Sequence, residues 1–352
     1  MYRFFLLLVS LTLIVMIVFP AQAQTSSEVD RALAWLREQQ QPDGGFSNGF
    51  APGSDPGTTA DAVLAIVAGG QDPATWTVGA ETPITYLAAA ARSQAPTPGL
   101  AAKLALAAAA AGGDPSDLGG VDLITAIEEG FDQSTGLIGG APYDSALAIL
   151  ALRVAGRPIP AKAVDGLLAF RLDDGSFSFN GDRTPGAGDS NTTALVVQAL
   201  AAAERSDGLS PSIEYFRSTQ NPDGGWTYQK PSAFGEATDA NSTALVLQAL
   251  RAAGEDPADW GDPARTLESL QLPNGAFIFN AATSSENLLA TVQAVPAMAG
   301  LSISDIGHSV AAETAPLDGG WLDARLVAAT LIGLVAILIG MTLVARRGKR
   351  QA

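Results

Sequence analysis

The chain has 352 residues and no cysteine, and its 36 acidic residues outnumber its 20 lysines and arginines, which gives a formal net charge of −16. Without cysteine the protein has no disulfide, no thioester and no thiolate metal ligand. All 36 acidic residues but only 14 of the basic ones lie between Glu28 and Asp323, so that part carries −22 and repels nucleic-acid phosphates, which predicts no nucleic-acid partner. An acidic surface is equally typical of a highly soluble protein.

Residues 1–23 have the features of a secretory signal peptide. Arg3 precedes a long apolar stretch, Phe4 to Phe19, and the small-residue site Ala21-Gln22-Ala23 predicts cleavage before Gln24. Because the apolar stretch is rather long for a signal, an uncleaved anchor helix is the alternative. In both cases the bulk of the chain is exported.

Five short loops rich in Asp, Asn and Gly punctuate the middle of the chain. Four of them end on an aromatic residue, namely QPDGGF at 41–46, LDDGSF at 172–177, NPDGGW at 221–226 and LPNGAF at 272–277, and a degenerate fifth, DQSTGL, begins at Asp132. A separation of 49 residues between Asp174 and Asp223, and of 51 between Asp223 and Asn274, is typical of repeat architectures. The loops therefore predict a repeated structural unit.

Each unit is predicted to contain two helices. The first, such as Val29 to Gln40, has apolar residues at helical spacing among charged and amide residues. The second opens on Asp, Ser, Thr or Asn, which are good N-caps, and continues almost entirely in Ala, Leu and Val. Examples of the second helix are Thr58 to Ala68, Asp144 to Val154, Asp189 to Ala202 and Asp239 to Ala252. A helix that is apolar on nearly every face must be buried, so we expect the second helices to form an inner ring.

Six such units are predicted. They start near Val29, Thr82, Val121, Ala161, Ser210 and Pro263, and in the unit from Thr82 the loop is replaced by Gln94 to Gly99. A closed ring of six helix pairs leaves no exposed apolar end, so we expect an all-α fold, an α6/α6 toroid over residues 24–301. An open solenoid with polar caps is the alternative.

The C-terminal region is predicted to anchor the protein in a membrane. A short stalk, 302–323, precedes a transmembrane helix at 324–345, whose uncharged run Leu326 to Ala345 is long enough to span a bilayer. The basic tail, 346–352, stays in the cytoplasm under the positive-inside rule, which predicts a single-pass type I protein of the cell membrane with the toroid on the extracellular side. A buried helix of a soluble domain is the alternative.

The repeat loops and the inner-helix pattern resemble those of a known superfamily. The pattern Q-x-P-D-G-G-F/W followed by S/T-T-A-L-x-x-Q-A-L resembles the repeats of terpenoid cyclases and protein prenyltransferases, over roughly Val29 to Leu301. The segments 239–250 and 189–195 resemble most the helical domain of cobalamin carriers such as intrinsic factor and transcobalamin. The resemblance implies the toroid.

The chemistry of these relatives does not carry over with the fold. Squalene cyclase-type enzymes use an Asp-x-Asp-Asp acid, which this chain lacks, and prenyltransferases hold a catalytic zinc with Asp, Cys and His, whereas this chain has no cysteine and a single His308 in the predicted stalk. We therefore expect no catalytic residue, no metal and no cofactor. The expected ligand is either a partner protein or an apolar small molecule, for which a corrinoid is one candidate. A corrinoid would need a second chain as its lid.

The polar residues at the starts of the inner helices, with aromatics from the preceding loops, are the candidate binding site. In a toroid these starts converge at one mouth of the central cavity, where hydrogen-bonding groups surround an apolar well. The candidates are Asp55, Asp61, Tyr143, Asp144, Asp189, Asn191, Tyr228, Asp239, Asn241 and Glu286. For each polar residue taken alone, a role as a helix N-cap is the alternative.

Two further functions stay open at this point. Carboxylates such as Asp189 and Asp239 could act as acid and base in a glycan-active or cyclase-like enzyme, for which the distance between them matters. A purely structural surface protein would bind no small molecule. The sequons Asn191-Thr-Thr and Asn241-Ser-Thr leave glycosylation undecided.

Overall fold

The computed structural model describes residues 27–93, 95–233 and 235–307. The predicted signal peptide, the transmembrane helix, the basic tail and His308 lie outside the described residues. Within them, none of the helices combines the length and apolar character needed to cross a bilayer. The fold below is that of this described part.

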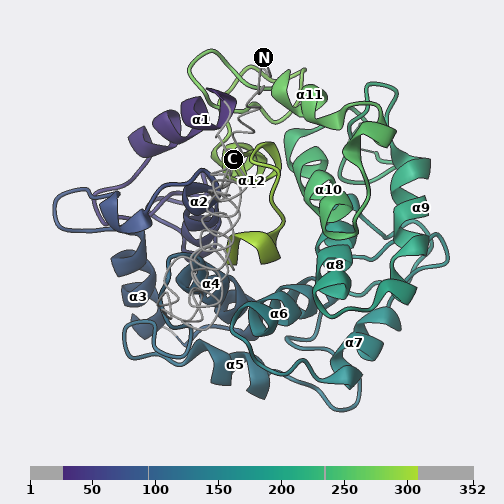
Figure 1. The fold of residues 1–352 in the computed structure, drawn as a ribbon, viewed down its shortest axis with the longest axis horizontal. Helices are drawn as coiled ribbons and strands as arrows, with labels where there is room; N and C mark the ends of the chain where they lie inside the picture. The colour runs from purple at the N-terminus through teal and green to yellow at the C-terminus, as the bar shows by residue number, and fades with distance from the viewer. Residues whose placement is uncertain (1–26, 94, 234, 308–352) are drawn as a thin grey trace, which may run out of the picture. The chain divides into compact units, whose positions relative to one another are not determined.

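Twelve α-helices form two concentric rings in the described part of the chain (Figure 1). The inner ring consists of α2 (Pro56–Ala68), α4 (Pro98–Ala110), α6 (Pro142–Val154), α8 (Ser190–Ala202), α10 (Ala240–Ala252) and α12 (Leu288–Met298). The outer ring consists of α1 (Ser27–Glu38), α3 (Pro83–Ser93), α5 (Leu123–Glu129), α7 (Ala161–Leu168), α9 (Ser210–Thr219) and α11 (Pro263–Glu268). Each inner helix packs on the next, and α12 packs on α2, so the ring is closed. The predicted α6/α6 toroid is confirmed.

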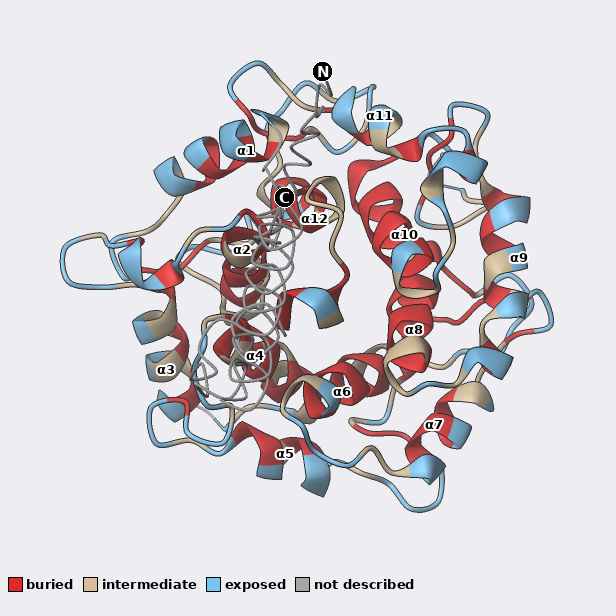
Figure 2. Cartoon of the chain, in the orientation of Figure 1, coloured by how far each residue is buried: buried red, intermediate tan, exposed pale blue. Residues whose placement is uncertain are grey.

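The inner helices are buried on almost all sides because their sequences are built from small and aliphatic residues (Figure 2). Helix α4, PGLAAKLALAAAA, places Leu104 and Leu106 in the core, and its alanines allow α2 and α6 to approach closely. The outer helices bury one stripe and expose the other, as α1 does with Leu33 and Leu36 turned inward. The core is therefore the layer between the two rings.

One hydrogen bond fixes each repeat loop to the inner helix that follows it. The backbone N–H of Phe46 donates to Thr59 Oγ1 at 2.9 Å, and that of Trp226 donates to Thr243 Oγ1 at 3.0 Å. Phe177, Phe277 and Ile138 make the same bond to Thr193, Thr291 and Ser145. Because these side chains are buried, the bond satisfies a backbone donor that water cannot reach. The recurring Ser or Thr in the inner helices is the anchor of the loop.

The first glycine of each loop packs on the start of the next outer helix. Its φ is positive, and a Cβ on Gly44, Gly175 or Gly275 would strike the backbone of the next unit at Thr82, Pro211 or Arg31. The contact of Gly275 with Arg31 joins the last unit to the first. The ring is thus closed by the same contact that links four of the five other pairs of neighbouring units.

Two regions depart from the regular repeat. The link between α3 and α4 is only 94–97, so the second unit lacks a glycine loop, as the sequence predicted. Residues 302–307, predicted to begin the stalk, instead continue the packed body: they form a helical turn at 303–307 in which Ile303 and Ile306 are buried. The reason is that these isoleucines complete the apolar lining inside the ring.

Candidate functional site

The inner helices present one common face to the centre of the ring. The sixth residues of the six helices are Asp61, Lys103, Leu147, Leu195, Leu245 and Gln293, and all of them line a single central cavity. The ninth residues of four of these helices, Leu64, Leu106, Gln248 and Pro296, line it one turn deeper, because positions three or four apart share a helix face. We call this cavity the central well.

The C-terminal turn forms the floor of the central well. Ile303 and Ile306 line it, and the backbone N–H of Ile303 donates to Gln198 Oε1 at 3.0 Å. Gly307 lies against Val154, the last residue of α6, so the turn lies at the ends of the inner helices opposite to their N-caps. The remaining cavity has a volume of ≈ 50 Å³, which holds only a few water molecules or a small chemical group.

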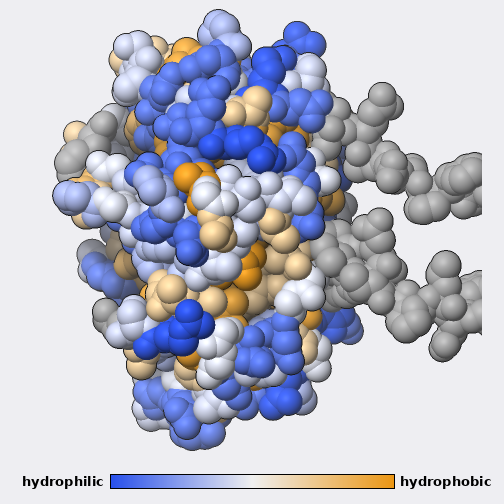
Figure 3. Space-filling model, turned by 90° about the vertical axis from the view of Figure 1, so that its left-hand side faces the viewer, coloured by the Kyte–Doolittle hydropathy of each residue, from blue (hydrophilic) through white to orange (hydrophobic). Residues whose placement is uncertain are grey.

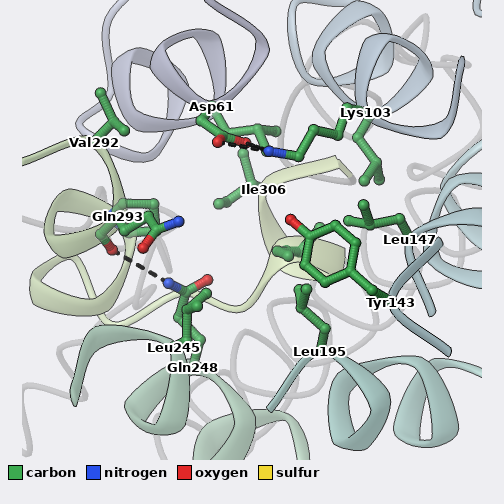
Figure 4. A pocket seen from close by; sticks show the side chains of 14 residues that line it. Asp61, Lys103, Tyr143, Leu147, Leu195, Leu245, Gln248, Val292, Gln293 and Ile306 are labelled. Atoms are coloured by element: carbon green, nitrogen blue, oxygen red, sulfur yellow. Dashed lines mark hydrogen bonds and ion pairs between the residues drawn. The ribbon is translucent and has the colours of Figure 1, made fainter. Parts of the chain in front are cut away.

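An ion pair stands in the wall of the central well (Figure 4). Lys103 Nζ lies 3.0 and 2.8 Å from the two carboxylate oxygens of Asp61, so α4 and α2 are joined by two charged hydrogen bonds. Burial opposes the charge on Lys103, but Asp61, with smaller contributions from Tyr143 and Asp55, holds its pKa above the ordinary value. The side chains of Lys103 and Asp61 are 20% and 16% exposed, which shows that they remain reachable from the well.

Two amide side chains face the well from the other side. Gln293 Oε1 accepts from Asn241 Nδ2 at 2.8 Å, and Gln248 Nε2 donates to the backbone oxygen of Gln293 at 3.3 Å. These bonds hold both amides in place, and Figure 4 shows the amide nitrogen of Gln293 pointing into the space between the side chains. Tyr143 also turns its hydroxyl into this space, and burial raises the pKa of that phenol. The well therefore offers fixed donors and acceptors within an aliphatic wall.

Exposed aromatic residues stand above the N-termini of three inner helices. The backbone oxygen of Tyr228 accepts from the first N–H of α8, and that of Phe279 accepts from the first N–H of α10, both at 2.8 Å. At α6, whose first residue is a proline, the ring of Phe179 instead packs at a tilt of 43° on Tyr143, with ring centroids 4.8 Å apart. Phe179, Tyr228 and Phe279 are 53%, 45% and 39% exposed. We call these three residues the aromatic rim.

The structure brings only some of the predicted site residues into the well. Asp61 and Tyr143 line it directly, and Asn241 reaches it through Gln293. Asn191 occupies the same helix position on α8 as Asn241 on α10, and its buried Oδ1 has no hydrogen-bond partner among the described residues. Tyr228 belongs to the aromatic rim.

Three of the predicted carboxylates are helix N-caps. Asp55, Asp189 and Asp239 accept from the backbone N–H of Thr58, Thr192 and Ser242, each at 2.7 Å. Asp239 also accepts from Tyr228 N at 3.0 Å, so its second oxygen is used as well. None of the three lines the well. Burial raises the pKa of Asp189 and of Asp239 to about 6, although the hydrogen bonds that they accept from the first turns of their helices lower it.

The last two predicted residues lie apart from the well. Asp144 packs against Gly99 at the contact of α6 with α4, where burial raises its pKa. Glu286 is exposed and accepts from Asn274 Nδ2 at 2.5 Å, which joins the two ends of one loop. Neither side chain lines the central cavity.

The sequence pattern missed Lys103, Gln248 and Gln293. The polar openings of the inner helices drew attention to their first turns, whereas these residues lie in the second and third turns. A usable signal was present: each is a long polar side chain within a largely apolar helix, and the same helix position carries leucine in three of the other inner helices. Aligning the helices by their starts would have placed all three on one face.

Comparison with known proteins supports the fold. Neither a protein-family model nor a curated protein matches the sequence. Among solved structures, the type II terpene cyclase MstE from Scytonema is similar with a TM-score of 0.57 and 15% identity, over 77% of this chain and 96% of that one. Haptocorrin in complex with Cbi is similar with a TM-score of 0.52 and 16% identity, over 79% of this chain and 67% of that one.

A third similar structure is the unsaturated glucuronyl hydrolase from Bacillus sp. GL1, with a TM-score of 0.55 and 13% identity, over 77% of this chain and 94% of that one. The expected likeness to terpenoid cyclases and cobalamin carriers is confirmed at the level of the fold. Three different activities share this toroid, so the fold leaves the function to be argued from the site.

Proposed function

We propose that the protein is an exported, membrane-anchored binding protein whose toroid holds an apolar small molecule with one polar end. The observation that carries the proposal is the Asp61–Lys103 pair in a wall that is otherwise mainly aliphatic. A partly buried ion pair adds little stability compared with well-packed leucines, so its presence on the well face favours a role in recognition.

The site has two parts that suit the two ends of such a ligand. The ≈ 50 Å³ well accepts a single polar group, such as a hydroxyl, carbonyl or amide, beside Lys103 and Gln293. The aromatic rim offers flat apolar surface for a ring system or a polyprenyl chain. A corrinoid or a terpenoid lipid fits this division, with its body on the rim and one substituent in the well.

An acid-catalysed reaction fits the same residues less well. Protonating an alkene requires a neutral, strongly acidic carboxyl group, whereas Asp61 is held by the ammonium group of Lys103. Asp189 and Asp239, the alternative acid and base, are only 1% exposed and cap their own helices. Binding is therefore the better-supported function.

A thermal-shift screen of the full chain in detergent tests the proposal, with cobinamide, polyprenyl alcohols and neutral oligosaccharides as probes. The decisive variant is Asp61→Leu with Lys103→Met, which removes both charges at similar volume, and the matched control is Glu204→Leu with Arg153→Met, an exposed pair. We expect a probe that stabilises the parent and the control but not the well variant. Stabilisation of all three proteins, or stabilisation by oligosaccharides alone, would contradict the proposal.

A further inference from the structure

The second residues of the six inner helices surround the mouth of the central well. Each lies four positions before the sixth residue of its helix, and residues four apart share a helix face, so the second residues stand one turn above the wall of the well. We call them the mouth ring, which in chain order is Gly57, Gly99, Tyr143, Asn191, Asn241 and Leu289. Because the two glycines lie on neighbouring helices, α2 and α4, one half of the mouth ring carries no side chains.

Packing explains only one of these two glycines. A Cβ on Gly99 would lie 2.2 Å from Asp144 Oδ1, so that position has no room for a side chain. A Cβ on Gly57 would lie 3.4 Å from Asp55 Oδ1 and 3.9 Å from Lys103 Cδ, which are ordinary contact distances, and the φ of Gly57 is not in the left-handed region. Since alanine favours a helix more than glycine does, neither the backbone nor the packing accounts for glycine at position 57.

The open half of the mouth ring lies over the ion pair. Gly57 is four residues before Asp61 on α2, and a side chain on Gly57 would contact the stem of Lys103. The sixth residues of α12, α2 and α4 are half-buried, whereas those of α6, α8 and α10 are buried. Because α2 packs on both α12 and α4, the half-buried residues form one continuous side of the well, and Gly57 stands above its middle.

The aromatic rim occupies the other half of the mouth. Phe179, Tyr228 and Phe279 stand above α6, α8 and α10 and are the flat apolar surface on which the body of a ligand can lie. Figure 3 shows the outer side of the ring at α1 and α3, where a mostly hydrophilic surface surrounds smaller groups of apolar atoms. An apolar ligand therefore gains more contact on the rim than on this outer side, and its polar end reaches the ion pair across the open half of the mouth.

We propose that Gly57 is the entry to the central well, and that the missing side chain there determines which ligands reach Lys103. The inference rests on the proposed function: the body of the ligand stays on the aromatic rim while its polar end passes over Gly57 to the ion pair. A larger residue at position 57 covers the stem of Lys103 and closes the half-buried side of the well. Because the charges of Lys103 and Asp61 balance each other, a charged end group would stay unpaired, so the group that passes is neutral, such as a hydroxyl or an amide.

Thiol labelling of the full chain in detergent tests the proposal without a ligand, because the protein has no cysteine of its own. The reporter is Leu147→Cys in the wall of the well, and the reagent is methyl methanethiosulfonate, which turns the thiol into a methyl disulfide and releases methanesulfinate. Gly57→Leu is added to the reporter. The matched control is Asn191→Leu at the same helix position on α8, where Asn191 Oδ1 has no hydrogen-bond partner to lose among the described residues. We expect labelling to slow about tenfold with Gly57→Leu, since the reagent then waits for a local opening of the mouth, and to stay unchanged in the control.

Unfolding temperatures separate a closed entry from a damaged fold. Gly57→Leu should unfold at the same temperature as the parent or higher, because the position has room and leucine favours the helix, whereas Gly99→Ala should unfold at a lower temperature because of Asp144. A destabilised Gly57→Leu would contradict the proposal. Equal labelling rates with and without Gly57→Leu, equal slowing in the control, or a reporter that is not labelled at all would each overturn it, whether or not a probe binds. If no probe stabilises the parent, the proposed function fails while the labelling rates still decide the entry.

Discussion

The ammonium group of Lys103 lies between the two carboxylate oxygens of Asp61, at 3.0 and 2.8 Å, and joins two inner helices at the wall of the central well. Neither residue lies at the start of its helix. The pair therefore differs from the capping carboxylates Asp55, Asp189 and Asp239, whose oxygens serve the backbone. Asp61 and Lys103 instead place their charges at the lining of the central well.

The pair predicts a large difference between single and double substitution. Asp61→Leu alone leaves the Lys103 charge without its partner in a site where it is only 20% exposed, so we expect a loss of roughly 2–4 kcal/mol in the free energy of unfolding. The double variant with Lys103→Met should recover most of that loss, because no charge is then left unpaired. Urea unfolding of the two proteins measures the difference. A double variant as unstable as the single one would show that the pair itself holds the ring together.

The buried caps predict that stability rises as the pH falls from neutral to mildly acidic. Burial raises the pKa of Asp189 and Asp239 to about 6 from the ordinary 3.8 of an aspartate, so between these values the folded protein binds more protons than the unfolded chain. The protonated carboxyl groups therefore add to the free energy of unfolding in full below pH 4, and this addition is lost as the pH rises through 6. It amounts to at most about 3 kcal/mol for each group.

Asp189→Asn tests this pH dependence, because asparagine caps a helix as well as aspartate but does not titrate. As the pH rises from 4 to 7, the thermal unfolding midpoint should fall less steeply in this variant than in the parent protein. Asp122→Asn is the control: hydrogen bonds from Thr125 lower the pKa of Asp122, so its contribution changes only below pH 4. If the unfolding midpoint changes with pH by the same slope in Asp189→Asn and in the parent, Asp189 is not the source of the pH dependence.

The sequence predicted the ring but only part of the well, for a physical reason. The glycine turns and the apolar inner helices are local patterns, and burial leaves few other solutions for helices such as α4 and α8. The well depends on which side of each inner helix faces the centre. A helix that is apolar all round carries no hydrophobic stripe to show that side, so the signal for Lys103 and Gln293 was their shared position in the inner helices rather than a hydrophobic pattern. The floor was missed because Ile303 and Ile306 lie where the predicted stalk begins.

Ring closure predicts that two glycines with similar backbone angles differ sharply in their tolerance of a side chain. Gly275 has φ +99°, and a Cβ there would strike the backbone of Arg31 in the first unit, whereas Gly186 has φ +81° with nothing within 4 Å. Gly186→Ala should cost about 1 kcal/mol for the left-handed angle alone. Gly275→Ala adds a backbone clash at the closure and should cost several times as much. Urea unfolding compares them, and equal losses would show that the closure yields without strain.

The floor of the well predicts a gain of ligand binding from a destabilising substitution. Ile306 is fully buried and lines the well, so Ile306→Ala should cost roughly 2–5 kcal/mol and extend the ≈ 50 Å³ cavity by the removed volume. Ile127→Ala in α5 removes the same atoms from an equally buried site that does not line the well. Both variants should lower the unfolding temperature, but benzene should raise it again more strongly in Ile306→Ala, because only there does the new space adjoin an existing apolar cavity. If benzene stabilises both variants equally, the C-terminal turn does not limit the size of the well, and the small volume must be set by the inner helices themselves.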